Sequence, residues 1–300
     1  MRLRKQTKFA VGKLHEALEA NSREVNMTAP YVPDLGIVYP DKPDGRMVPV
    51  NPIRDVVVDE NYPFLDKTFR FKFIRSVIYI GIYSIVHLVG FIRFGIKIEG
   101  RKNLRKHKEL LKNGAMTIAN HVQRWDFIFV AQAIRYRKLY FPAWKEHLKG
   151  RDAGKIRYAG GIPVPESIKA IKSFNLAFDE IRQKKIWLHA FPESSRFDYY
   201  VPIRPFKKGV FTLAYRYNLP IVPIAFSYRK AHFPFTLVNL FRTIIGYKKL
   251  PLTTLRIGEP ILFDTTLDRK QAVQKIRKEC HEAVVKLAGI TDNPYPAEGD

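Results

Sequence analysis

The chain of 300 residues contains a single cysteine, Cys280. No disulfide can therefore form within the chain, and a reducing cytosolic compartment is allowed, although it is not required. Cys280 also has no base near it in the sequence, so we do not expect it to act as a nucleophile.

Several patterns that carry chemistry in other proteins are also absent from the sequence. The serine elbow Gly-x-Ser-x-Gly occurs nowhere, which excludes an α/β-hydrolase nucleophile. No group of residues has the spacing of metal ligands or of a zinc finger. We therefore expect no metal and no bound cofactor.

Acidic residues are scarce relative to basic ones. The chain has 28 Asp and Glu against 52 Lys and Arg, for a net charge of +24. This excess predicts attraction to polyanions, and the candidates are an anionic membrane surface, nucleic acid and an acidic carrier protein.

His121 and Asp126 form a candidate catalytic pair. A histidine beside a carboxylate can take a proton from an alcohol, because the carboxylate orients the ring and stabilises its protonated form. Positions five apart lie roughly 140° apart around a helix, so the two side chains meet only if His121 stands in a turn. We predict a strand over 116–119 and a helix starting at Asp126. A turn histidine with an N-capping aspartate is the alternative without catalysis.

Three further blocks follow in the chain. They are Gly-Gly-Ile-Pro-Val-Pro at 160–165, Phe-Pro-Glu-Ser-Ser-Arg at 191–196 after an apolar run over 186–191, and Leu-Pro-Ile-Val-Pro-Ile at 219–224. Together with Asn-His and Asp126, they resemble in order the four blocks of the glycerolipid acyltransferases, which include glycerol-3-phosphate and 1-acylglycerol-3-phosphate acyltransferases. The resemblance runs from about residue 97 to residue 261.

The resemblance implies acyl transfer from a thioester to a lipid hydroxyl. His121 would be the general base and Asp126 would orient its ring. No covalent enzyme intermediate is required, because a thioester is already activated. Glu193 would accept a hydrogen bond from the acceptor hydroxyl, and Arg196 would anchor an anion. The predicted substrate-binding residues are Glu193, Ser194, Ser195, Arg196, Gly161, Lys207 and Lys208. Oxyanion donors are expected among backbone N–H groups near Gly160.

Two positions depart from the family pattern. The family's second block commonly ends in an arginine thought to grip the acceptor's phosphate, whereas Pro165 follows Val164 here. Ser194 replaces the usual glycine of the third block and adds a side chain where the backbone would approach the substrate. The acceptor is therefore left open. Arg204 or the cations of the substrate-binding set could still hold a phosphate.

Residues 76–92 are the longest apolar stretch. As a helix they would be about 25 Å long, shorter than the ~30 Å core of a bilayer. Basic residues flank both ends. We expect a helix that lies in the interface or dips into the cytoplasmic leaflet, and a buried core helix is the alternative. Residues 233–245 could also touch a membrane, although a helix packed on the sheet is favoured.

The predicted organisation has three parts. Residues 1–65 form a basic N-terminal arm with a Pro-rich extended region, to which we assign no catalytic role. A disordered linker is the alternative for that region, and the basic start is not a signal peptide. Residues 66–95 form the membrane-associated apolar helix. In residues 96–300 strands and helices alternate, which predicts an α/β domain with a mixed sheet flanked by helices.

The predicted function is transfer of a fatty acyl chain from acyl-CoA or acyl carrier protein to lysophosphatidic acid, giving phosphatidic acid. The protein would sit at the cytoplasmic face of a membrane, as a monotopic or peripheral protein. Its expected partners are an anionic membrane surface, the lysolipid and an acidic acyl carrier protein, without nucleic acid. The alternatives are another lysolipid acceptor, or a basic membrane- or nucleic-acid-binding protein without catalysis.

Overall fold

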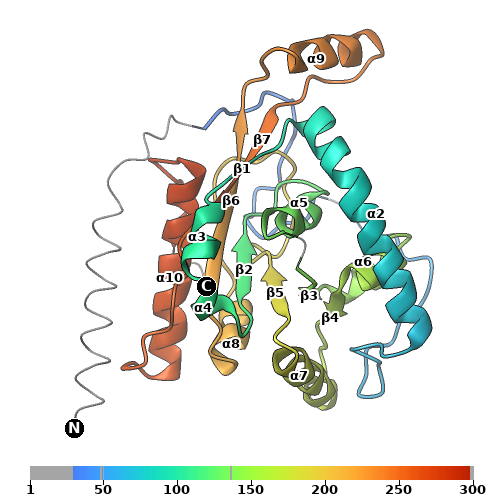
Figure 1. Ribbon diagram of the computed structural model, residues 1–300, viewed down its shortest axis with the longest axis vertical. Coiled ribbons are helices and arrows are strands. Elements are labelled where there is room, and N and C mark those ends of the chain that lie inside the picture. Colours follow the sequence, from blue (N-terminus) through green and yellow to red (C-terminus); the bar gives the residue numbers. More distant parts are fainter. Residues whose placement is uncertain (1–29, 48, 50, 136, 298–300) are drawn as a thin grey trace.

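The computed structural model describes residues 30–47, 49, 51–135 and 137–297. The basic start of the chain and the first part of the predicted arm lie outside these residues. The described part contains one sheet with helices on both faces (Figure 1). This confirms the α/β prediction.

Seven strands form the sheet in the order β1-β7-β6-β2-β5-β3-β4. Strands β6, β2, β5, β3 and β4 are parallel, while β7 is antiparallel to β6 and β1 is parallel to β7. The sheet is therefore mixed, as predicted. The strands are β1 (Lys97–Glu99), β2 (Met116–Ala119), β3 (Leu139–Ala143), β4 (Gly161–Pro163), β5 (Trp187–Ala190), β6 (Ile221–Arg229) and β7 (Leu252–Ile257).

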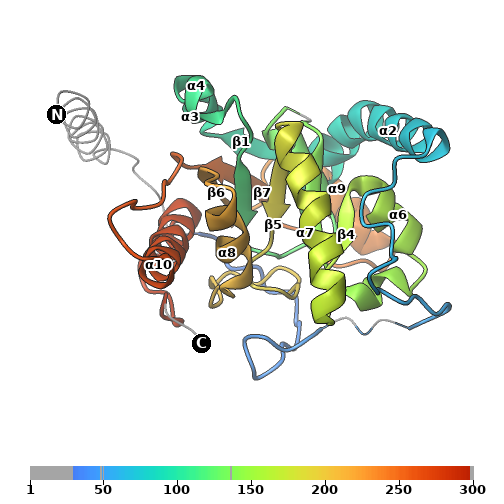
Figure 2. The same ribbon diagram turned by 90° about the horizontal axis from the view of Figure 1, so that it is seen from below.

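Helices cover the two faces of the sheet. One face carries α7 (Ile168–Gln183), α8 (Gly209–Arg216) and α10 (Arg269–Ala288), and the other carries α3 (Arg101–Lys106), α4 (Lys108–Leu111), α5 (Asp126–Ala133) and the end of α2 (Phe69–Phe94) (Figure 2). The remaining helices are η1 (Lys145–Leu148), α6 (Ala153–Ala159) and α9 (Phe235–Ile244). Met116 and Ile118 pack in the core of the first face and Ala119 in that of the second. Strand β2 is buried on both of its faces, and its residues are apolar except for Thr117.

Helix α2 is longer than the predicted apolar segment. It begins after Thr68, whose hydroxyl accepts from the Phe71 N–H at 3.2 Å, and it ends at Gly95, which has a left-handed φ of 49°. Its 26 residues extend about 39 Å. The guanidinium of Arg75 donates to Leu139 O at 2.8 Å and the hydroxyl of Tyr79 to Ala159 O at 3.0 Å, so this side of the helix is fixed to the domain.

The opposite side of α2 and most of α9 are exposed. The prediction that favoured packing of 233–245 on the sheet is wrong, because Asn239 is the one buried residue within α9. The Phe91 and Phe235 rings meet edge to face at 5.9 Å, which joins the two helices. We call the exposed apolar side chains the α2–α9 surface: Phe69, Phe73, Val77, Ile80, Ile85, Leu88 and Phe91 of α2, with Leu237, Leu240, Phe241 and Ile244 of α9. Among the described helices, none combines the length and apolarity needed to cross a membrane.

Strands β6 and β7 continue beyond the rest of the sheet. Ala119, the last residue of β2, pairs with Ile224, whereas β6 continues to Arg229, which pairs with Leu252 of β7. This two-stranded ribbon leads into α9. Helix α9 therefore stands beyond the edge of the sheet at which β2 ends (Figure 1).

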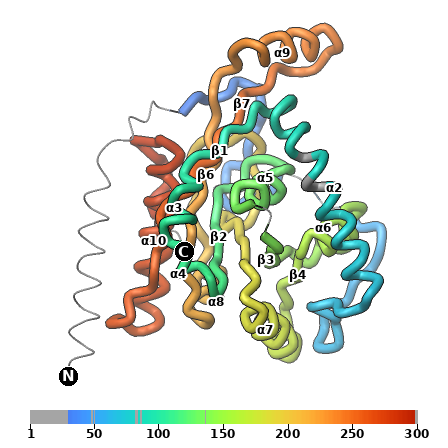
Figure 3. The backbone as a smooth tube through the Cα atoms, in the orientation of Figure 1, coloured from blue at the N-terminus to red at the C-terminus, as the bar shows by residue number. Residues whose placement is uncertain are grey.

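The described part of the Pro-rich region, 30–66, has no helix or strand but lies against the domain. The N–H of Tyr31 donates to Tyr228 O at 3.3 Å, and the hydroxyl of Ser173 donates to Glu60 O at 2.8 Å. The arm runs from the end of the molecule that carries α9 to the start of α2 (Figure 3). The described residues of this region are therefore attached to the domain at both of these points.

Candidate active site

The site begins where β2 ends. Asn120 is buried, and its side-chain amide donates to Phe226 O at 3.1 Å while its oxygen accepts from the Phe226 N–H at 2.8 Å. The Asn120 side chain thereby forms the two hydrogen bonds with β6 that the backbone of a further β2 residue would form. His121 follows in the turn at the carboxyl edge of the sheet, where open α/β sheets place their ligands.

His121 and Asp126 are in contact, as predicted. Nδ1 of His121 lies 2.9 Å from Oδ2 of Asp126, at the first residue of α5. The same oxygen accepts from the N–H groups of Val122 at 2.6 Å and Gln123 at 2.8 Å, so Asp126 closes the turn that carries the histidine. The aspartate is fully buried, whereas 23% of the His121 side chain is exposed.

The surroundings favour a neutral histidine. Burial, and next the nearby Arg196 guanidinium, lower the pKa of His121 well below its ordinary value of 6.5. Burial raises the pKa of Asp126, but the N–H donors of Gln123 and Val122 oppose this shift and favour the carboxylate. A carboxylate can only accept, so Nδ1 of His121 carries the proton. Nε2 is then left with the lone pair that a general base requires.

Glu193 occupies a different place from the one predicted. It is 2% exposed, and its Oε2 accepts from the His121 N–H at 2.9 Å and from Nη2 of Arg204 at 2.8 Å. Its Oε1 accepts from the Arg204 N–H at 2.9 Å. Glu193 thus fixes the backbone of His121 instead of offering an exposed oxygen to an acceptor hydroxyl.

Arg204 neutralises that buried carboxylate. Its guanidinium is 1% exposed, lies over the Phe197 ring and donates to the hydroxyl of Ser195 at 2.8 Å and also to the carbonyl of Ser195. Arg204 was one of the candidates for a phosphate ligand. The structure places it inside the protein instead, where the Glu193 and Ser195 oxygens occupy it.

The third block wraps around the His121 ring. Phe191 stacks on this ring with centroids 4.0 Å apart and planes 11° from parallel, and the Phe197 N–H donates to His121 O at 3.0 Å. Ser194 is exposed and adopts a left-handed φ of 64°, a conformation that glycine takes more easily. Ser194 and Ser195 therefore lie in the loop beside the histidine, and the Ser195 oxygens bind Arg204.

Arg196 is the exposed cation of the site. Its Nε lies 2.7 Å from Oδ1 of Asp198, and 22% of its side chain is accessible. Its charge is among the main causes of the lowered pKa of His121, so the guanidinium lies within electrostatic reach of the ring. This position agrees with the anion-anchoring role predicted for it.

The second block lies away from the histidine. Gly161 is in β4, at the sheet edge, and a Cβ there would be 2.6 Å from the Ile156 side chain. The Gly160 N–H donates to Arg157 O at 3.1 Å, at the end of α6. The N–H of Gly160 itself is therefore already bound, and the prediction of oxyanion donors near Gly160 stays a prediction. Gly161 instead permits close packing of β4 on α6.

The two lysines before α8 differ. Nζ of Lys207 lies 3.1 Å from Oδ2 of Asp44 in the arm, and its N–H donates to Pro192 O at 2.8 Å. Lys208 is exposed at the start of α8. Lys207 is therefore held by the arm, while Lys208 remains accessible.

Three further titratable residues are His189, Cys280 and His147. His189 is fully buried, and its Nδ1 lies 2.9 Å from the Thr117 hydroxyl. Cys280, in α10, is buried in the hydrophobic core. His147 is exposed in η1, where burial lowers its pKa first, followed by the charges of Arg46 and His121. His147 therefore lies near the catalytic pair.

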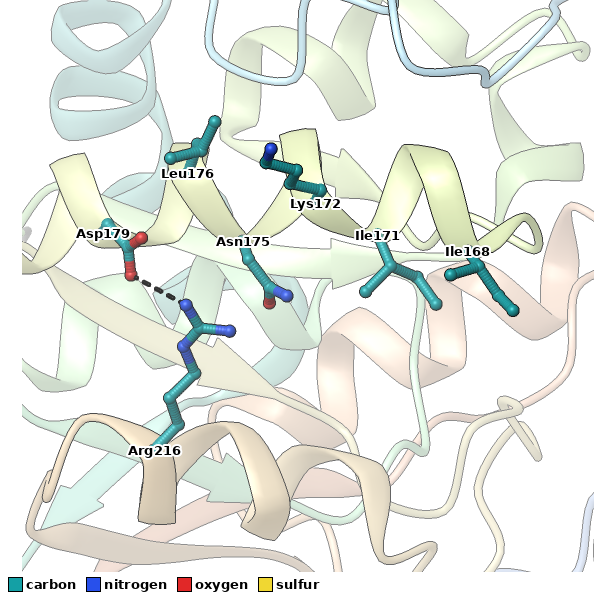
Figure 4. A pocket seen from close by; sticks show the side chains of 7 residues that line it. All are labelled: Ile168, Ile171, Lys172, Asn175, Leu176, Asp179 and Arg216. Atoms are coloured by element: carbon teal, nitrogen blue, oxygen red, sulfur yellow. Dashed lines mark hydrogen bonds and ion pairs between the residues drawn. The ribbon is translucent and has the colours of Figure 1, made fainter.

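Two surface hollows lie elsewhere. One, of about 270 Å³, is lined by residues of α7 and by Arg216 of α8, which bonds to Asp179 at 3.3 Å (Figure 4). The other, of about 540 Å³, follows the end of α10 and the C-terminal segment. Neither is lined by a residue of the four blocks.

Sequence reasoning missed the contribution of the arm. Tyr39 stacks on Phe197, its hydroxyl donates to Asp198 O at 2.9 Å, and the Arg46 guanidinium lies over the Trp144 ring at 3.2 Å. The only sequence signal is a few aromatic and basic residues in a Pro-rich stretch, because pairing over such separations has no local pattern.

Comparison with known proteins points to one family. Residues 95–227 match the family model described as Acyltransferase, a range that contains all four blocks. A comparison with curated proteins found no match. Among solved structures, the chain is similar to the 1-acyl-sn-glycerophosphate (LPA) acyltransferase PlsC from Thermotoga maritima. Identity is 18%, coverage is 75% of this chain and 84% of that chain, and the TM-score is 0.48. The part of the chain around His121 is therefore similar to the Acyltransferase family.

Proposed function

We propose that the protein transfers an acyl chain from an acyl thioester to the free hydroxyl of lysophosphatidic acid, giving phosphatidic acid. The observation that carries the proposal is the neutral His121 ring, bonded to buried Asp126 at 2.9 Å, with the Arg196 cation beside it. This arrangement combines a base for a hydroxyl with an anchor for an anionic headgroup.

In the proposed reaction, Nε2 of His121 takes the proton as the hydroxyl oxygen attacks the thioester carbonyl. The tetrahedral intermediate collapses by breaking the C–S bond, and the protonated histidine returns its proton to the leaving thiolate. Asp126 stabilises the imidazolium formed in between. No nucleophile from the protein is needed, because the acceptor hydroxyl can attack the thioester directly once the two substrates are aligned.

The donor would be acyl-CoA or an acyl carrier protein thioester, and no other cofactor takes part. Exposed basic residues near the site would attract either donor, since both are anionic. The net charge of +24 supports this electrostatic attraction.

The proposed site of action is the cytoplasmic face of an anionic membrane, with the protein monotopic or peripheral. The α2–α9 surface exposes apolar side chains such as Leu88, Leu240 and Phe241, at 61%, 56% and 62%. Exposed basic residues stand close to it in the chain, among them Arg93, Lys230 and Lys248. Apolar side chains beside cations suit the interface of an anionic bilayer.

The function is tested by incubating the full chain with acyl-CoA and acyl carrier protein thioesters and a panel of lysolipids in detergent micelles. We expect phosphatidic acid from lysophosphatidic acid, and a loss of about 10²–10⁴-fold in His121→Ala. His232→Ala, which removes an exposed histidine beside α9, is the matched control. Near-full activity of folded His121→Ala would contradict the role of His121 as general base. A higher kcat/KM for another lysolipid would show that lysophosphatidic acid is not the preferred acceptor.

A further inference from the structure

The arm is attached to one side of the active site. Tyr39 stacks on Phe197 with centroids 5.9 Å apart, and its hydroxyl donates to Asp198 O at 2.9 Å. Pro43 O accepts from Nη1 of Arg204 at 3.0 Å. Asp198 is also the partner of Arg196, so the arm contacts the residue that positions the predicted anion anchor.

The arm is attached to the opposite side as well. The Arg46 guanidinium carbon lies 3.2 Å from the centre of the Trp144 ring, whose edge meets His147 at 5.4 Å. The Ile53 N–H then donates to Lys149 O at 2.9 Å. The described residues of 39–53, which are 39–47, 49 and 51–53, therefore link the third-block loop to the segment around η1, and His147 lies within electrostatic reach of both Arg46 and His121.

We propose that residues 39–47 form the outer wall of the acceptor site and that Arg46, together with Arg196, binds the acceptor's phosphate monoester. This inference rests on the proposed function and deepens it. It gives the arm a role in substrate binding, which the sequence did not suggest.

The contacts of Arg46 suit this role. Stacking on Trp144 occupies one face of the guanidinium and leaves its edge, which carries the N–H donors, for other partners, and Arg46 is exposed. The Glu146 carboxylate lies within electrostatic reach of Arg46, but among the described residues no hydrogen bond or ion pair joins it or any carbonyl to these donors. A phosphate binds a guanidinium through such an edge, in paired hydrogen bonds.

The same arm explains why the neighbouring cations are less suited. Lys207 is paired with Asp44, and Arg204 is buried against Glu193. Pro165 offers no donor at all, since its side chain is apolar and its nitrogen carries no hydrogen. Arg46 would therefore supply the positive charge that the second block lacks.

The test compares Arg46→Ala with Arg54→Ala in the full chain. Arg54 lies on the same arm, is exposed and has no hydrogen bond, ion pair or ring contact with another described residue, and its replacement changes the net charge equally. We expect Arg46→Ala to raise KM for lysophosphatidic acid about tenfold with kcat retained, the lower range for a charge-assisted hydrogen bond. Arg46→Lys should have an intermediate effect. KM for monoacylglycerol, which has no phosphate, and KM for acyl-CoA should stay unchanged.

A second readout is independent of turnover. Glycerol 3-phosphate should raise the melting temperature of the wild-type protein and of Arg54→Ala, but not that of Arg46→Ala. An unchanged KM for lysophosphatidic acid, or an equal rise for monoacylglycerol, overturns the inference while the proposed function stands. If Arg46→Ala raises KM for acyl-CoA, Arg46 binds the phosphates of the donor instead, and this result also overturns the inference. If the wild-type protein acylates no lysolipid but shows the Arg46-dependent shift, the function fails and the anion site stands.

Discussion

The turn around His121 and the α2–α9 surface are built in opposite ways. In the turn, polar groups meet specific partners: Asp126 Oδ2 accepts two backbone N–H bonds and contacts the ring, and Glu193 accepts three hydrogen bonds. On the surface, large apolar side chains such as Leu240 and Phe241 are more than half exposed.

This difference fits our proposal that the turn serves catalysis, whereas the α2–α9 surface serves membrane attachment. Directional contacts fix atoms to within fractions of an ångström, so each residue in the turn has few acceptable substitutes. An apolar surface acts through its area, so many side chains can replace one another there. Changes in the turn should therefore alter catalysis or folding, and changes on the surface should alter membrane binding alone.

The largest expected effect is that of Asp126→Asn. An amide can keep the backbone bonds of the turn, but it favours the wrong tautomer of His121 and cannot stabilise the imidazolium. We expect kcat to fall about 10³-fold, within the range for general base catalysis. The measurement is kcat with lysophosphatidic acid, with the melting temperature as the check on folding. The His121→Ala, Asp126→Asn double variant should be hardly worse than His121→Ala, and independent losses would contradict a shared role.

Next comes Arg204→Met, which leaves the Glu193 carboxylate buried without its partner. Breaking a buried pair from one side costs about 3–5 kcal/mol of unfolding free energy. Urea denaturation measures this loss. The matched variant is Glu193→Gln with Arg204→Met, which removes both charges and should recover part of it. A single variant within about 1 kcal/mol of the wild type would show that the pair does not stabilise the turn.

Substitutions on the α2–α9 surface should weaken membrane binding without a loss of activity. Leu240→Glu with Phe241→Glu places two charges where we expect lipid contact, and we predict about tenfold weaker sedimentation with anionic liposomes. Activity in detergent micelles should be unchanged. Ile168→Glu with Leu176→Glu is the control, because these α7 residues are 87% and 59% exposed but lie outside the surface. Equal loss in both variants would indicate a general charge effect. Duplex DNA binding without liposome binding would favour the nucleic-acid alternative.

The smallest effect concerns pH. Because Arg196 lowers the pKa of His121, Arg196→Gln should raise it and move the acidic limb of kcat/KM to higher pH. In the wild type this limb should lie below 6.5, the ordinary value for histidine. Arg124→Gln, which breaks an exposed pair with Asp152, is the comparison. If the acidic limb lies at the same pH in the wild type and in Arg196→Gln, the charge of Arg196 does not lower the pKa of His121.

Local patterns predicted much of this structure. The strand over 116–119, the turn at His121 and the helix from Asp126 are all present, because apolar runs and caps act over a few residues. The mixed sheet also follows the predicted alternation of strands and helices. The role of Glu193 could not be predicted, because it depends on which groups are already bound in the folded chain.

Long-range pairing explains the other differences. Arg204 reaches Glu193 across 11 positions, and the arm reaches Asp198 across 159. No periodicity marks such contacts. The exposure of α9 was missed for a related reason, since an apolar helix has the same pattern whether its partner is a sheet or a lipid.

The ribbon of β6 and β7 has a consequence for geometry. Beyond Ile224, β6 continues for five residues to Arg229 with β7 as its strand partner, which is a rise of about 17 Å. The length of this ribbon sets how far α9 stands from the level of the catalytic turn. Because side chains alternate along a strand, removing two residues from each strand would lower α9 by about 7 Å without inverting the ribbon's faces. The protein thus contains an adjustable spacer, measured in residue pairs, between its acid–base chemistry and its outermost helix.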